Sequence, residues 1–241
     1  MMRLMIMLLM MLALTFPLRG YAQSAEESPS RKTISELTQS AELKDKVDPK
    51  LLSKALSGYY ALKEQGKVSR DGILTVIDFN RPSVDERLFV IDVNAGRLLY
   101  SGLVAHGSRS GENYARSFSN RPGSRRSSLG FFTTGDTYEG HNGYSLRLLG
   151  MERGVNDKAQ KRSIVMHGAD YVSYDYISKH GRLGRSQGCP ALSFEGFQQV
   201  IDLIKGGSCL FIYNNAREYV VKSKGHKSRL ARRQAASLPI S

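Results

Sequence analysis

The sequence predicts a mainly β domain with flanking helices, preceded by N-terminal helices. Two observations support this class. Short apolar runs separated by glycine, proline and asparagine turns dominate from residue 73 onward. Helical spacing of apolar residues is confined to a stretch before residue 66 and to one segment near 194–205. A chain of 241 residues with 41% hydrophobic content is long enough for one large domain with an extension.

The first residues are typical of an export signal. Arg3 precedes the apolar run 4–17, and Gly20-Tyr21-Ala22 supplies a small-x-small cleavage site, so residues 1–22 are predicted to be a signal peptide. The apolar run is too short for a typical membrane span, although a retained N-terminal anchor is the alternative. We therefore expect a periplasmic or otherwise extracytoplasmic protein.

Residues 23–68 are predicted to form a polar linker and helices. A weak helix is expected over 33–46. A better one follows, with Asp48 as its N-cap and Pro49 at its first position. Its apolar face comprises Leu51, Leu52, Ala55, Leu56, Tyr59 and Leu62.

Residues 69–216 are predicted to form the main domain. Strands are expected at 73–79, 88–93, 97–104, 130–134, 145–149, 163–166 and 209–213. A helix is expected at about 194–205, with Ser193 as its N-cap.

Two long loops, 105–128 and 168–190, interrupt these elements. Loops of this length in a compact domain are functional or disordered. The sequence His-Gly follows an apolar strand at both places, which predicts that His106 and His167 lie at strand ends and face a common surface.

The two cysteines differ in their surroundings. Cys209 lies in the apolar run SCLFIY and is expected to be a small buried hydrophobe. Cys189 lies in a loop flanked by glycine and proline. Although the two could pair in an oxidising compartment, an unpaired Cys189 is a candidate nucleophile.

A thiol becomes a nucleophile most simply beside an imidazole, and His167 is the best candidate base. The Gly168 carbonyl is a candidate acceptor that orients the ring, although a purely structural histidine is the alternative. Gly188 allows close approach of a substrate, and the N–H groups of 187–189 are candidate oxyanion donors. Arg182 and Arg185 add positive charge that favours a thiolate and an acidic substrate.

His167-Gly168, followed by Ser186-x-Gly188-Cys189, resembles the L,D-transpeptidase catalytic (YkuD-like) family, in particular its murein L,D-transpeptidase branch. The family signature is a histidine-glycine and then Ser/Thr-His-Gly-Cys. The resemblance covers about residues 50–215 and includes the stretches 87–107, 117–131, 162–169 and 184–192. It implies a twisted, mostly β domain of sandwich or barrel type, with the active cysteine at the mouth of a cleft.

The resemblance implies that Cys189 is the nucleophile and His167 its base. Gly188 with Cys189 matches the oxyanion backbone, while Ser186, Gln187 and Gly168 match positions that support the loop. Gln187 replaces a second histidine of many members and cannot titrate, and Pro190-Ala191 replaces a hydrophobic-Arg/Asn pair. The substrate-contacting positions are predicted to be Arg185, Arg182, His106 and Ser128, with loop closure as the alternative for His106.

The activity implied by the resemblance is acyl transfer on peptidoglycan. The Cys189 thiolate attacks the L-centre carbonyl of the third residue of a stem tetrapeptide, D-alanine leaves, and an amine of another stem accepts the acyl group. Inactivation by carbapenems is implied as well. The alternatives are an L,D-carboxypeptidase, with water as acceptor, and a non-catalytic peptidoglycan-binding protein. No cofactor is expected, and a zinc site at His106, His167 and Cys189 lacks a close ligand pair.

The formal net charge is +13, with 35 Lys and Arg against 22 Asp and Glu. Because an exported protein meets little nucleic acid, the expected acidic partners are the wall polymer and anionic lipid headgroups. Residues 217–241 are predicted to form a basic tail, since 222–233 carries six Lys or Arg and no acid. A solvated tail and a patch that contacts an anionic surface are its two interpretations, and the sequence predicts no oligomeric state.

Overall fold

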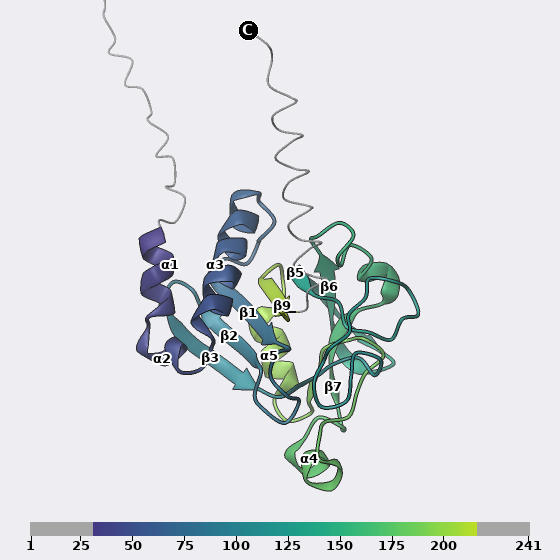
Figure 1. Cartoon of the computed structure of the whole chain (residues 1–241). Coiled ribbons are helices and arrows are strands. Elements are labelled where there is room, and N and C mark those ends of the chain that lie inside the picture. The colour runs from purple at the N-terminus through teal and green to yellow at the C-terminus, as the bar shows by residue number, and fades with distance from the viewer. Residues whose placement is uncertain (1–30, 216–241) are drawn as a thin grey trace, which may run out of the picture.

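A computed structural model describes residues 31–215, in which nine strands form one mixed sheet in the order β3-β2-β1-β9-β5-β6-β7-β8-β4 (Figure 1). The β1–β9 and β7–β8 pairs are parallel, and the other pairs are antiparallel. The strands are β1 Ile73–Asp78, β2 Leu88–Asp92, β3 Arg97–Gly102, β4 Val104–Ala105, β5 Gly130–Gly140, β6 Gly143–Gly150, β7 Val165–Ala169, β8 Ala191–Ser193 and β9 Cys209–Tyr213.

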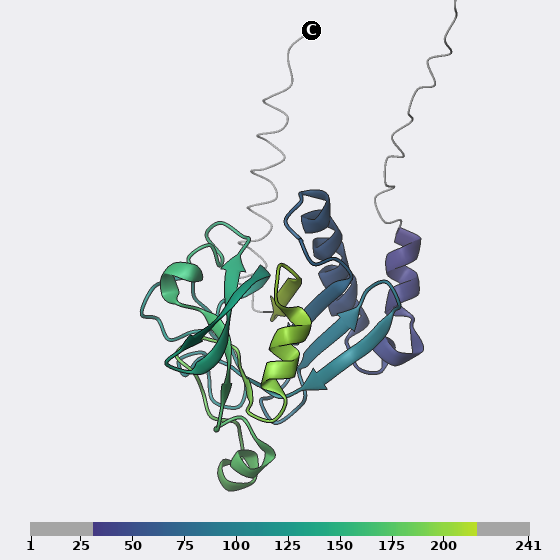
Figure 2. The same ribbon diagram turned by 180° about the vertical axis from the view of Figure 1, so that it is seen from behind.

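The helices flank this sheet. They are α1 Arg31–Thr38, α2 Ala41–Lys44, α3 Pro49–Glu64, the 3₁₀ turn η1 Gln160–Arg162, α4 Tyr174–His180 and α5 Phe197–Ile204. Helix α3 packs on β1 and β9, and α5 contacts β1, β6 and β7. Figure 2 shows α5 lying across the sheet, while α4 projects away from it. The prediction of a mainly β domain with flanking helices is confirmed.

The neighbouring strands β1 and β9 are buried along nearly their whole length and are largely apolar. In β1 only Ile73 is less than fully buried, and in β9 only Tyr213. Strands that are buried on both sides have continuous apolar runs rather than an alternating pattern. This is why the runs at 73–79 and 209–213 identify these strands so closely.

The start of α3 agrees with its prediction in detail. The Asp48 side chain accepts a hydrogen bond from the Leu51 N–H at 2.8 Å, and Pro49 is the first helical residue. The helix ends before Gly66, whose φ of +64° suits a glycine.

Several predicted boundaries were wrong. The strand expected at 163–166 runs from Val165 to Ala169, so His167 lies within β7 rather than after it. The strand expected at 97–104 is divided into β3 and β4. Helix α5 begins after Gly196 because Ser193 still belongs to β8 and so cannot cap a helix. The long loop 168–190 contains α4, which sequence periodicity did not reveal.

The end of the sheet formed by β7, β8 and β4 positions the candidate site. His167 lies in β7, Cys189 lies two residues before β8, and His106 follows β4 directly. Three segments far apart in the sequence thus reach the same edge.

The predicted signal peptide 1–22 and basic tail 217–241 lie outside the described residues, as does most of the linker that follows the signal. Across residues 31–215, none of the helices has the length and apolar character that a membrane span requires.

Replacing the N-cap of α3 tests how firmly this helix begins. Asp48→Ala removes the hydrogen bond to the Leu51 N–H, so we expect the free energy of unfolding to fall by about 1 kcal/mol in urea titrations. Lys50→Ala, in the same exposed turn, is the control and should change it by less than about 0.5 kcal/mol. Equal effects of both substitutions would contradict a specific capping role.

Candidate active site

The loop that carries Cys189 is anchored by Ser186. The Ser186 hydroxyl accepts a hydrogen bond from the Gly188 N–H at 3.0 Å and donates one to the Cys189 carbonyl at 2.5 Å. The Ser186 backbone pairs with the chain after β4, since its N–H donates to the His106 carbonyl at 3.0 Å and its carbonyl accepts from Ser108 at 2.7 Å. These bonds fix the loop locally and join it to the first long loop.

Gly188 is required by both conformation and space. Its φ of +127° lies in a region that side chains disfavour. A Cβ at this position would also lie 2.9 Å from the backbone carbonyl oxygen of Arg126. The backbone beside the candidate nucleophile is therefore packed directly against the segment 119–128.

The Cys189 sulfur rests on the backbone that leads into β7. The Val165 N–H donates to Sγ at 3.5 Å, and the thiol donates to the Ser163 carbonyl at 3.6 Å. Ser163 has a left-handed φ of +53°, which turns the chain from η1 into β7. Burial raises the pKa of the Cys189 thiol, while the Val165 N–H and the Arg162 charge act in the opposite direction.

His167 is buried, with 5% of its surface exposed. Its Nδ1 lies 2.8 Å from the Gly168 carbonyl oxygen, and because a carbonyl only accepts, Nδ1 carries the proton. This tautomer leaves Nε2 as an acceptor. Burial lowers the pKa of His167, and the Gly168 carbonyl partly offsets that effect. The imidazole is thus held neutral with one nitrogen able to take a proton.

The strands bring His167 and Cys189 together without joining them. His167 pairs with Ala191 in the parallel β7–β8 ladder, two residues beyond Cys189. Within residues 31–215 no hydrogen bond connects the sulfur to the imidazole, because the sulfur binds backbone groups instead. Catalytic hydrogen bonds of this kind commonly tighten only when substrate is bound.

Arg162 is a site residue that the sequence analysis missed. Its guanidinium donates to the Ser119 carbonyl at 2.6 Å, the Ser128 hydroxyl at 2.5 Å, the Ser124 hydroxyl at 3.1 Å and the Arg126 carbonyl at 2.6 Å. Its Nη2 also lies 3.3 Å from where a Cβ on Gly188 would stand. The available signal was its position at the start of the stretch 162–169.

His106 is fully buried and closes a loop. Its Nδ1 lies 2.9 Å from a guanidinium nitrogen of Arg87, and its Nε2 lies 3.2 Å from the Gly111 carbonyl oxygen. Arg87, also fully buried, donates twice to the Val104 carbonyl. Burial and the Arg87 charge lower the pKa of His106 to about 4. Of the two roles considered for His106, loop closure fits this position, whereas substrate contact does not.

The other predicted substrate contacts are engaged within the protein. Arg182 Nε and Arg185 Nη1 lie 3.0 and 2.5 Å from the two carboxylate oxygens of the exposed Glu112. Ser128 is buried, and its hydroxyl donates to the Ser119 carbonyl while accepting from Arg162. In this conformation Arg182 and Arg185 tie the second long loop to the first, and Ser128 is bound within the first loop and to Arg162.

Aromatic side chains pack against β7, the strand that carries His167. A Cβ on Gly168 would lie 2.8 Å from the ring of Phe194 and 2.9 Å from that of Phe197. Tyr171 packs against Gly184, and burial together with the Cys189 charge raises the pKa of its phenol to about 12. Phe194 is largely exposed beside the site, so an apolar surface is available next to His167.

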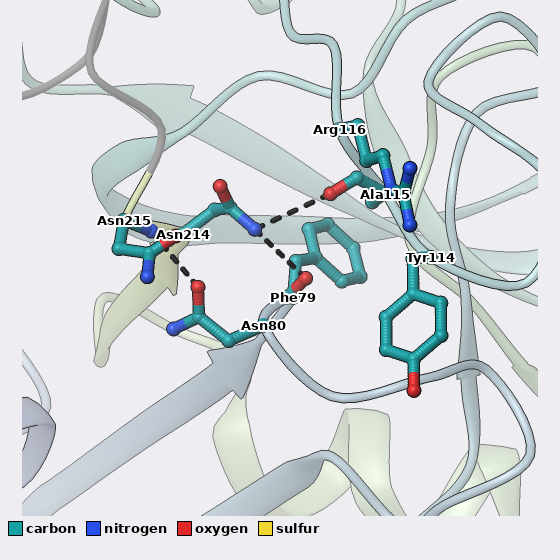
Figure 3. Close-up of a pocket in the computed structure, with 7 residues that line it drawn as sticks. All are labelled: Phe79, Asn80, Tyr114, Ala115, Arg116, Asn214 and Asn215. Atoms are coloured by element: carbon teal, nitrogen blue, oxygen red, sulfur yellow. Dashed lines mark hydrogen bonds between the residues drawn. The ribbon is translucent and has the colours of Figure 1, made fainter.

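A pocket of about 340 Å³ lies elsewhere, between β1, the first long loop and the end of β9 (Figure 3). Asn214 Nδ2 donates to the carbonyls of Phe79 and Ala115, and the Asn215 N–H donates to the Asn80 side chain. The lining residues are Phe79, Asn80, Tyr114, Ala115, Arg116, Asn214 and Asn215, which include neither Cys189 nor His167.

Cys189 and Cys209 are both free thiols. Cys209 is fully buried in β9, and burial raises its pKa to about 12, so it is inert at neutral pH. Among the described residues no cluster of three His, Cys, Asp or Glu is arranged to hold a metal ion.

A half-buried thiol in the loop before β8 and a neutral imidazole in the neighbouring strand β7 are groups of the kind that cysteine-dependent acyl transfer uses. The family model for the L,D-transpeptidase catalytic domain matches residues 43–213. The chain belongs to this family, as its motifs predicted.

The chain is similar to several solved structures at low identity. The L,D-transpeptidase from Mycobacterium smegmatis is 14% identical, with a TM-score of 0.36 and 59% of each chain covered. The helical cell shape determining protein Pgp2 from Campylobacter jejuni is 13% identical, with a TM-score of 0.39, 66% of this chain covered and 55% of that one. The L,D-transpeptidase (Yku) from Stackebrandtia nassauensis is 13% identical, with a TM-score of 0.38 and 70% and 68% covered.

The chain spans less than two thirds of the length of the first two of these structures. A search of curated proteins returned no match.

The buried His106 predicts a pH-dependent loss of stability. Its folded pKa of about 4 lies below its ordinary 6.5, so the unfolded chain binds a proton that the folded ring does not. The neutral His106 therefore contributes fully to the free energy of unfolding above about pH 6.5. As the pH falls toward 4, the free energy of unfolding decreases by roughly 3 kcal/mol from this group.

His106→Gln should show a shallower decline of unfolding free energy between pH 6.5 and 4 in urea titrations, because an amide does not titrate there. His180→Gln, at an exposed position of α4, should follow the parent curve. Parallel curves for the parent and His106→Gln would contradict the assignment.

Proposed function

We propose that this protein is an exported peptidoglycan L,D-transpeptidase in which Cys189 is the nucleophile and His167 the base. The observation that carries the proposal is the parallel β7–β8 pairing. In this pairing His167 lies opposite Ala191, two residues beyond Cys189, within the residues that match the family. Peptidoglycan stem peptides are the proposed partners, and the periplasm or another extracytoplasmic space is the proposed location.

In the first step, His167 Nε2 takes the proton of the Cys189 thiol while the sulfur attacks the carbonyl of the L-centre of the third stem residue. The bond to D-alanine breaks, and the imidazolium returns its proton to the departing amine. A thioester between Cys189 and the stem remains. The Nδ1 hydrogen bond to the Gly168 carbonyl supports this role, because it keeps Nε2 unprotonated and oriented.

The resting state of this pair is neutral. Burial raises the pKa of the thiol and lowers that of the imidazole, so both effects oppose a preformed thiolate–imidazolium pair. Proton transfer then accompanies substrate attack rather than preceding it. A neutral thiol is also less readily oxidised than a permanent thiolate, which suits an exported enzyme.

The developing oxyanion needs N–H donors near Cys189. The Gly188 N–H already donates to the Ser186 hydroxyl, so it supports the loop in this conformation. Within the described residues the Cys189 N–H makes no hydrogen bond, and we propose it as the principal backbone donor.

In the second step, an amine of a neighbouring stem attacks the thioester, with His167 as base, and forms the cross-link. Thioesters react readily with amines and hydrolyse slowly, which favours transfer over hydrolysis. Water as acceptor would make the protein an L,D-carboxypeptidase. A wall-binding protein without catalysis is the third possibility. It would give no role to the unprotonated Nε2 of the buried His167. Family membership further supports acylation of Cys189 by carbapenems.

Incubation of the purified protein with a tetrapeptide muropeptide, followed by mass spectrometry, tests the proposal. A cross-linked dimer with released D-alanine supports the transferase, and monomeric tripeptide with D-alanine supports the carboxypeptidase. Unchanged substrate would exclude both. Cys189→Ala should abolish turnover, whereas Cys209→Ala, which removes the buried thiol, should retain it.

Gln187→His tests whether position 187 contributes to proton transfer. Gln187 is exposed and outside the hydrogen bonds that hold the loop, so we expect the substitution to leave kcat/KM within about tenfold, or about 1.4 kcal/mol in barrier. The same muropeptide assay measures this. A larger gain in rate would mean that a second histidine supplies chemistry that the parent lacks.

A further inference from the structure

We propose that Arg162 is a positioning residue that holds the segment 119–128 against the nucleophile loop and places a fixed positive charge beside the Cys189 sulfur. The inference rests on the proposed function in taking Cys189 as the nucleophile. Two independent features of the structure carry it: the hydrogen bonds of the guanidinium, and the close packing of three backbones around Gly188.

Both terminal nitrogens of the Arg162 guanidinium are fully engaged in hydrogen bonds. Its two terminal nitrogens donate four hydrogen bonds, all to the segment 119–128, at 2.5 to 3.1 Å. Two acceptors are backbone carbonyls and two are serine hydroxyls, so the bonds neutralise none of its charge. An arginine fork bound to neutral acceptors holds a loop in place and remains a full cation.

The segment 119–128, which Arg162 holds, packs against the backbone of the loop 186–189 that carries Cys189. A Cβ on Gly107 would lie 2.6 Å from the Arg125 carbonyl oxygen and 2.9 Å from the Gly188 Cα. The Arg126 carbonyl oxygen would lie 2.9 Å from a Cβ on Gly188. Three backbones thus meet with no side chain between them, and a shift of the segment would open this contact.

Arg162 directly precedes the short stretch that binds the Cys189 sulfur, and its charge acts on the thiol through space. Arg162 precedes Ser163, whose carbonyl accepts from the thiol, and Val165, whose N–H donates to the sulfur. On deprotonation the bond to Ser163 is lost, while the Val165 N–H and the Arg162 charge both stabilise the anion. Burial opposes ionisation, and Arg162 lowers the pKa of Cys189 against it.

The other ionisable groups of the candidate site do not replace this cation, since Arg162 is the charge that lowers the pKa of the Cys189 thiol. Tyr171 has a pKa raised to about 12 and is neutral at the working pH. His167 is neutral in the resting state because burial lowers its pKa. Arg182 and Arg185 pair with Glu112, which cancels part of their charge. Arg162 is therefore the cation that assists formation of the thiolate.

Two substitutions separate the charge of Arg162 from its hydrogen bonds. Arg162→Met removes both, while Arg162→Lys keeps the charge and loses the fork. Lys161→Met, which removes the exposed cation next to it, is the matched control. Ser124→Ala removes one of the four acceptors and leaves the charge in place.

The first measurement is the rate of Cys189 alkylation by iodoacetamide from pH 6 to 10, followed by intact-protein mass spectrometry, with Cys189→Ala as the blank. We expect Arg162→Met to react about tenfold more slowly than the parent at pH 8, because an adjacent opposite charge lowers a pKa by about one to three units. Arg162→Lys, Ser124→Ala and Lys161→Met should stay within about threefold. A profile of Arg162→Met equal to or faster than the parent's would overturn the electrostatic role.

The second measurement is limited trypsin digestion, since Arg121, Arg125 and Arg126 are exposed on the held segment. Both Arg162 variants should be cleaved there at least about fivefold faster than the parent and the Lys161→Met control. Cleavage at the parent rate would overturn the positioning role. Neither measurement requires turnover of muropeptide, so an inactive parent would refute the proposed function alone, and an active parent with unchanged variant profiles would refute this inference alone.

Discussion

The candidate site depends on the parallel pairing of β7 with β8. This pairing sets His167 opposite Ala191 and carries the cysteine loop to the start of β7, where the sulfur meets the Ser163 carbonyl and the Val165 N–H. The strands are short, and β4 extends the same edge through an antiparallel contact with β8. The segments that carry His167 and Cys189 are thereby held on a common framework of strands, which positions side chains more precisely than loops alone.

Neutral polar contacts, more than ion pairs, hold the loops around this framework. Ser186, Ser127 and Ser110 use their hydroxyls to satisfy backbone groups of neighbouring segments. Arg162 and Arg87 bind carbonyls rather than carboxylates. A buried guanidinium without an adjacent anion is costly unless its N–H groups are satisfied, and here those contacts fix the loop positions. These contacts leave both charges unneutralised, so that Arg162 acts on the Cys189 sulfur and Arg87 on His106.

The sequence predicted most of the strands and the start of α3, and the two segments on which it placed His167 and Cys189 are neighbours through the β7–β8 pairing. Continuous apolar runs define β1 and β9 because both faces of these strands are buried. Arg162 was missed because its partners are backbone carbonyls and hydroxyls some forty residues away, and no local pattern encodes such acceptors. Ser193 was assigned to a helix cap because serine before an apolar run is a common start signal, but pairing with β7 keeps it in a strand.

The two long loops are joined in two physically different ways. The bridge between Gly107 and Ser186 consists of short backbone hydrogen bonds beside the nucleophile, whereas Glu112 meets Arg182 and Arg185 at an exposed rim. Dissolved ions screen exposed ion pairs strongly and buried hydrogen bonds hardly at all. Ionic strength thus acts mainly on the rim: in concentrated salt the contacts of Glu112 with Arg182 and Arg185 weaken, while the backbone hydrogen bonds between the two loops beside Cys189 persist.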